Sequence, residues 1–200
     1  MRLQSSVSRV TIFVTLLGFP ASVMADENCG QLPTDSAVPS VQVFAVNDAR
    51  VPVGVLHRVQ AEVSRIFDTI GVVVTWAPAW PCDGQRTLVV RITAREMPET
   101  MVSPSTLGIT PSNPGERGTL AYVFYARVAQ ASEKYSASID TILAVTIVHE
   151  LGHMLMPYGS HAKSGVMSAQ WNESHFRLAS CGFLLFTPDV AALIRSGLGR

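Results

Sequence analysis

Hydrophobic and polar residues alternate along this chain in patterns that predict a succession of strands and helices. Residues 52–70 carry apolar side chains every three or four positions, and Gly71 follows them, which is typical of an amphipathic helix. Thr187 and Pro188 are typical of a helix start, so a last helix is expected to run to about Ser196. Short runs rich in Val, Ile, Thr and aromatic residues predict strands. We expect strands at 41–46, 72–77, 87–94, 106–110 and 120–128.

Residues 138–156 predict a helix that is apolar on almost every side. Their apolar positions recur at helical spacing, Ser138 or Asp140 could cap the start, and Pro157 follows the end. A helix of this kind is normally buried. Because two histidines and a glutamate lie on it, their polar atoms need partners, and a metal ion would provide one.

The polar residues of this helix lie in the segment His149-Glu150-Leu151-Gly152-His153, which is an HExxH motif. Residues four positions apart share one helical face, so both histidines could bind one Zn²⁺ while the glutamate polarises its water. The alternative is an ordinary helix that carries two hydrogen-bonded histidines. Zinc binding is the interpretation that we adopt.

A catalytic zinc site needs a third protein ligand if one coordination position is to remain for water. His161 is the leading candidate, because a turn after the helix could bring it back to the metal. Glu173 is the main alternative, since it lies twenty residues after His153, a spacing that resembles the second-helix glutamate of thermolysin-like enzymes. His175 and His57 are further candidates, and His57 is expected on the surface of an amphipathic helix.

These residues resemble the metzincin clan of zinc peptidases, whose signature is HExxHxxGxxH followed by a Met-turn. The HELGH segment, the downstream His161 and a Gly-Val-Met turn at 165–167 carry the resemblance. The chain departs from the signature, because Met156 stands at its glycine position and Gly159 at its third histidine position. His161 therefore comes two residues late, which a longer turn could absorb.

The resemblance implies roles for further residues. Met167 would lie beneath the metal as the apolar floor of the Met-turn. Some metzincins carry a tyrosine two residues later, but Ala169 stands there, so the hydrogen bond of that tyrosine is not expected. In the clan a short antiparallel strand lies at the sheet edge above the zinc, here at 106–110, where an extended peptide could pair with it. The predicted substrate-binding residues are Thr106, Leu107, Gly108 and Ile109.

The order of the elements indicates an α/β (α+β type) fold with a mixed, mostly parallel five-stranded twisted sheet. The metzincin resemblance adds an active-site helix, a Met-turn and a C-terminal helix, and it places a catalytic domain at 41–200. Residues 1–25 are predicted to be a signal peptide, because a positively charged start precedes a short apolar run and a small-residue cleavage site near Ala25. Residues 26–40 are then an N-terminal extension.

Export would place the protein in the periplasm or outside the cell, where disulfides form. Cys29, Cys82 and Cys181 cannot all pair within one chain, so one bridge and one free thiol are expected; a latency switch with the Cys29 thiolate on zinc is a second hypothesis. The chain has 15 basic and 15 acidic residues, which does not indicate a nucleic-acid partner. The apolar run of the signal segment is too short for a membrane span. Nothing in the sequence indicates an oligomeric state.

We therefore expect a secreted zinc-dependent peptidase that hydrolyses a peptide or protein substrate. Zinc would lower the pKa of its bound water to roughly 7, and Glu150 would act as the general base. The alternative is a secreted zinc-binding or peptide-binding protein without turnover. Glu150 argues against it, because a closed structural site does not use a glutamate that is not a ligand. Hydrolysis of a non-peptide amide is a third possibility with the same metal chemistry.

Overall fold

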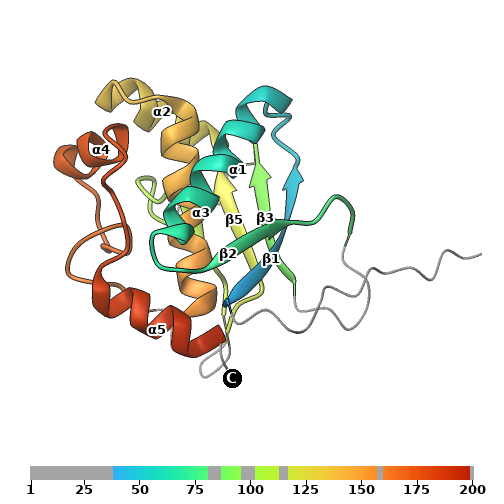
Figure 1. Cartoon of the computed structure of the whole chain (residues 1–200). Helices are drawn as coiled ribbons and strands as arrows, with labels where there is room; N and C mark the ends of the chain where they lie inside the picture. Colours follow the sequence, from blue (N-terminus) through green and yellow to red (C-terminus); the bar gives the residue numbers. More distant parts are fainter. Residues whose placement is uncertain (1–37, 81–86, 96–101, 113–116, 157–159, 199–200) are drawn as a thin grey trace, which may run out of the picture. The chain divides into compact units, whose positions relative to one another are not determined.

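Figure 1 shows the protein as a computed structural model, which describes residues 38–80, 87–95, 102–112, 117–156 and 160–198. The described residues all belong to one compact unit, residues 33–200. The predicted signal peptide, Cys29 and Cys82 lie outside the described residues.

The described strands form one mixed sheet. They are β1 (Ser40–Asn47), β2 (Val73–Trp76), β3 (Thr87–Thr93), β4 (Gly108–Ile109) and β5 (Leu120–Phe124). The strand order is β2-β1-β3-β5-β4. Strand β1 is parallel to β2 and β3, β3 is parallel to β5, and β4 at the edge is antiparallel to β5. This confirms the predicted mixed, mostly parallel sheet with a short antiparallel strand at its edge.

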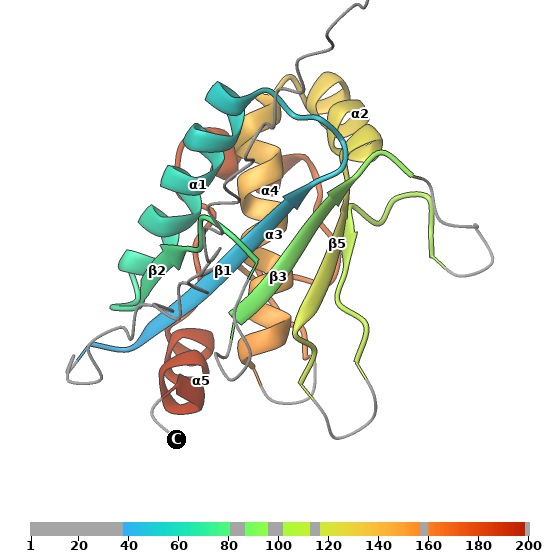
Figure 2. The same cartoon turned by 90° about the vertical axis from the view of Figure 1, so that its right-hand side faces the viewer.

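The described helices flank this sheet and its edge. They are α1 (Val53–Asp68), α2 (Tyr125–Tyr135), α3 (Ile139–Leu155), α4 (Glu173–Ser180) and α5 (Pro188–Leu198). Helix α3 packs against α1, β5 and β4, and α1 packs against β2. Figure 2 shows α3 behind β1 and β3, with α1 to its left beside β2. Because α1 also packs against α3, the two helices cover the same face of the sheet. Among the described residues, no helix has the length and apolar character that crossing a membrane requires.

Side chains that alternate along the strands supply the layer on which these helices pack. In β1, Val41 and Val43 are buried, whereas Phe44 is only partly buried. In β3, Leu88 and Val90 are buried in the same way. Successive residues of a strand point to opposite faces, so the buried rows share the face that the helices cover. Helix α1 adds its own buried row to this core: Val59, Val63, Ile66 and Phe67.

Helix α3 is buried along nearly its whole length, as its all-round hydrophobicity predicted. Ser138 caps its start, because its side chain accepts a hydrogen bond from the Thr141 N–H. The helix ends at Leu155, and Met156 already has extended backbone angles. A helix enclosed in this way must satisfy its polar side chains through neighbouring segments.

Helix α2 differs from the expectation drawn from the sequence. The strand predicted at 120–128 ends at Phe124, and the helix begins at the next residue. Aromatic and β-branched residues favoured a strand there, but strand propensity yields readily to tertiary packing. Arg127, Val128 and Ala131 recur at helical spacing and are buried where α2 packs against α3.

Arg127 connects α2, through hydrogen bonds, to the segment that leads into the edge strand. Its side chain is 6% exposed. One guanidinium nitrogen, Nη1, donates to the carbonyl oxygens of Ser103 at 2.8 Å and Thr106 at 3.0 Å. The guanidinium also lies over the Phe124 ring, 4.7 Å from its centroid. This arginine therefore fixes the approach of the chain to β4.

We expect Arg127→Leu to lower the free energy of unfolding by about 1–3 kcal/mol, because two carbonyls lose a charged donor. Chemical denaturation of the purified protein measures this change. The matched control is Arg177→Leu, which alters an exposed arginine on α4 and should change stability by less than about 0.5 kcal/mol. Equal losses in both variants would contradict the role given to Arg127.

Candidate metal centre

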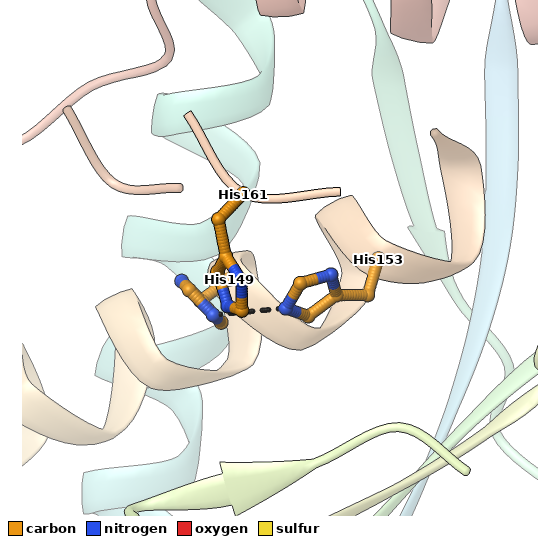
Figure 3. A group of neighbouring side chains, drawn as sticks. All are labelled: His149, His153 and His161. Carbon is orange, nitrogen blue, oxygen red and sulfur yellow. Dashed lines mark hydrogen bonds between the residues drawn. The ribbon is translucent and has the colours of Figure 1, made fainter. Parts of the chain in front are cut away.

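Helix α3 carries His149 and His153 one turn apart, so both imidazoles leave the same helical face. Their Nε2 atoms are 3.0 Å apart. Figure 3 shows the two rings turned toward one another, with the ring of His161 reaching them from a separate segment. A tetrahedral zinc with bonds of about 2.0–2.1 Å needs ligand nitrogens about 3.3 Å apart, so the spacing of this pair suits such an ion.

His161 completes a group of three histidines. Its ring centroid lies 5.3 Å from that of His149 and 4.7 Å from that of His153. One ligand nitrogen from each ring lies within 4.8 Å of the other two. Within the described ranges, this is the one cluster of three or more His, Cys, Asp or Glu residues that could hold a metal ion. The structure thus brings the three predicted ligands together.

The turn that follows His161 folds back on itself. The Ala162 N–H donates to the Met167 carbonyl at 2.8 Å, and the Ser168 N–H donates to the Gly165 carbonyl at 3.1 Å. Gly165 has a φ of 76°, a left-handed conformation that glycine adopts without strain. These bonds fix the shape of the predicted Met-turn.

Met167 is fully buried and packs directly against Gly152 of the HExxH motif. A Cβ atom at position 152 would overlap the sulfur of Met167 and approach its Cε to 2.9 Å. A side chain at position 152 would therefore force the Met167 side chain out of this position. Met167 thus lies against the helical turn between His149 and His153, consistent with the apolar floor that the metzincin resemblance implied.

The carbonyl oxygen of Val166 sets the orientation of His149. It accepts a hydrogen bond from the Nδ1 of His149 at 2.7 Å and from the Nε1 of Trp171 at 3.2 Å. Because a carbonyl can only accept, Nδ1 carries the proton and Nε2 offers its lone pair to a metal. Burial lowers the pKa of His149 to about 4, and burial also lowers the pKa of His161. Both rings are thereby held in the neutral form that binds metal ions.

Glu150 is 3% exposed, and its carboxylate lies against the edge strand. The hydroxyl of Thr110 donates to its Oε2 at 2.7 Å. Gly108 lies so close that a Cβ atom there would come 2.7 Å from Oε1. Burial raises the pKa of Glu150 to about 7, although the Thr110 hydrogen bond acts in the opposite direction. Sequence reasoning placed Thr110 at the end of the edge segment but did not identify its contact with Glu150.

A pocket of about 860 Å³ opens over these groups. The edge segment lines one side, including the four predicted substrate-binding residues, and α2 and α4 line another. His149, Glu150, His153 and His161 all border the pocket. A molecule bound in it would therefore contact both the histidine cluster and β4.

The other candidate ligands lie outside the histidine cluster. Glu173 is exposed in the first turn of α4, a helix that was not predicted from the sequence. His175 takes part in a capping box with Asn172 at the start of the same helix, and this local signal could have revealed the helix. His57 is exposed on α1, as expected.

No family model and no curated protein sequence matches the chain. Among solved structures, archaemetzincin from Methanopyrus kandleri is similar, with a TM-score of 0.52 and 17% sequence identity. The similarity covers 83% of this chain and 99% of that one. At this identity the likeness shows the fold. The chain therefore has an archaemetzincin-like fold, and its three histidines form a cluster that fits a metzincin-like site.

Proposed function

We propose that this protein is a zinc-dependent peptidase in which His149, His153 and His161 hold the metal and Glu150 is the general base. The observation that carries the proposal is the convergence of three imidazoles beside a buried carboxylate that does not join their cluster. A closed structural site would use such a carboxylate as a ligand or would lack it. The archaemetzincin-like fold supports the same activity.

The donor set suits zinc in particular. Three neutral imidazoles are a common catalytic ligand set for this ion and leave one coordination position for water or substrate. Zinc held in this way supplies Lewis acidity toward a carbonyl group and makes water nucleophilic near neutral pH. The Val166 carbonyl keeps His149 in the tautomer that such binding requires.

Glu150 moves the proton in the proposed reaction. Its carboxylate takes a proton from the attacking water and delivers it to the leaving amine. Thr110 donates to Oε2, which leaves Oε1 for the water. The close approach of Gly108 limits the positions that this carboxylate can take. We infer that the edge strand positions the base as well as the substrate.

The outer edge of β4, away from β5, is the proposed binding site for an extended peptide. The Phe124 N–H donates to the Leu107 carbonyl, and Gly108 and Ile109 pair with Val123 and Tyr122. Bonded positions alternate along an antiparallel strand, so the backbone groups of Gly108 point away from β5. They are free to pair with a substrate strand that runs along the pocket.

A secreted zinc-binding or peptide-binding protein without turnover is the competing function, and a non-peptide amide is the competing substrate. The position of Glu150 beside an open pocket favours catalysis over a structural site. We also propose that the chain is exported after cleavage near Ala25. Mass spectrometry of the N-terminus of the mature protein would test this.

Glu150→Gln should keep one zinc per chain, because this residue is not proposed as a ligand. The rate constant kcat should fall by about 10²–10⁴, the usual effect of removing a general base. Metal analysis and peptide hydrolysis on the same sample measure both quantities. Loss of zinc from this variant would mean that Glu150 is a ligand.

His161→Ala should weaken zinc binding by more than about 100-fold, since even the indirect supports of a metal ligand are worth about 10–100-fold. Glu173→Ala is the control and should bind zinc as the wild type does. Competition titration against a chelator of known affinity gives both values. If the two variants exchange these results, the third ligand is Glu173.

Thr110→Val should lower kcat by about tenfold, because a hydrogen bond to the charged base is lost while side-chain volume is kept. KM and zinc content should change little. Thr110→Ser restores the hydroxyl and should recover most of the rate. A serine variant that is as slow as the valine variant would show that Thr110 acts only through packing.

A further inference from the structure

One face of α2 forms a wall of the pocket, apart from the helix α3 that carries the histidine motif. Arg127, Gln130, Ala131 and Lys134 line the pocket, and they are spaced as i, i+3, i+4 and i+7. Residues with this spacing share one helical face. The wall is therefore a continuous strip of the helix. It carries two basic side chains, Arg127 and Lys134, whereas the metal centre carries three histidines and Glu150.

The neighbouring part of the pocket is aromatic. The Tyr135 ring stacks on the Phe176 ring of α4, with centroids 4.0 Å apart and planes 12° apart. Trp171 meets Phe176 edge to face at 6.0 Å. Thr146, one helical turn before Glu150, also lines the pocket. This surface suits the alkyl part of a side chain more than a charged group.

Lys134 brings positive charge to this aromatic recess. Its ammonium lies 5.0 Å from the centroid of the Tyr135 ring, and the side chain is exposed. In the part of the chain that the structure describes, no carboxylate forms an ion pair with it. Arg127, by contrast, is buried and bonded to backbone carbonyls. Lys134 is thus the cation of the wall that is exposed for a ligand.

The described lining of the pocket carries little negative charge. Glu150 is the acidic residue among the described residues that line the pocket, and its carboxylate accepts from Thr110 beside the histidines. A second carboxylate that entered near α2 would meet Lys134 and the polar amide of Gln130. A basic side chain there would face Lys134 with no described acidic partner on the α2 wall.

We propose that this recess selects an acidic side chain, Glu or Asp, of the peptide substrate, and that Lys134 is the residue that determines this specificity. The methylene groups of the substrate residue lie against the partly buried Tyr135 ring, and its carboxylate pairs with the Lys134 ammonium. The proposal rests on the proposed peptidase function and names its substrate class.

Measurements of peptide affinity test the acidic recess separately from catalysis. Zinc-loaded Glu150→Gln is titrated with fluorescein-labelled peptides that differ only in Glu, Gln or Lys at one position, and this position is moved along the peptide. At one position the Glu peptide should bind about fivefold tighter than the Gln peptide, the value of a partly exposed ion pair. The Lys peptide should bind most weakly. Equal affinity for the three at every position would overturn the proposal.

Charge reversal identifies the residue responsible. In the Glu150→Gln background, Lys134→Glu should reverse the order, so that the Lys peptide binds more tightly than the Glu peptide. The control is Arg95→Glu, which makes the same change in net charge on an exposed residue outside the pocket lining. It should keep the preference for Glu. Equal effects of the two variants, or no effect of Lys134→Glu, would overturn the assignment.

Turnover then separates this proposal from the peptidase function. With intact Glu150, kcat/KM for the peptide set should follow the same order as binding. If the zinc-loaded protein binds the Glu peptide selectively but hydrolyses none of the set, the peptidase function fails while the acidic recess stands. If it hydrolyses the Gln and Lys peptides as fast as the Glu peptide, the recess fails while the peptidase function stands.

Discussion

Burial of the polar groups of α3 is the constraint on which the rest of the structure depends. The helix is apolar on almost every side and lies against the sheet, α1 and α2, yet it carries two histidines and a glutamate. Unpaired polar groups in such surroundings cost several kcal/mol. Other segments must therefore bring partners to His149 and Glu150. The arrangement of those segments is also the arrangement of the candidate site.

Distant parts of the chain meet this requirement for His149 and Glu150. Thr110, after β4, donates to the Glu150 carboxylate, and Val166 accepts from His149. Met167 fits against Gly152, where a larger residue would displace the Met167 side chain. Since these contacts join segments far apart in sequence, the site is complete only when the sheet edge and the turn are both folded. Metal binding is for this reason expected to stabilise the folded state as a whole.

Sequence alone predicted the parts that depend on local pattern. The period of α3 and the HExxH spacing are local, and so are the strand patterns and the C-terminal helix. The antiparallel place of the short edge strand followed from the metzincin resemblance. The helical state of α2 was not predictable in this way, because packing of Arg127 and Ala131 overrides a strand-like composition. The contact of Thr110 with Glu150 and the place of Lys134 in the pocket lining likewise come from tertiary structure, and no spacing in the sequence encodes them. Helix α4 was missed although Asn172 and His175 carry a capping signal.

The central claim is that three histidines hold a zinc ion that acts with Glu150 to hydrolyse peptides. The most direct measurement is the rate of peptide hydrolysis by the purified protein before chelation, after removal of the metal and after addition of zinc. The account predicts that activity is lost with the metal and returns when one equivalent of zinc is bound. Hydrolysis that persists in metal-free protein, or a zinc-loaded protein that cleaves no peptide, would contradict it.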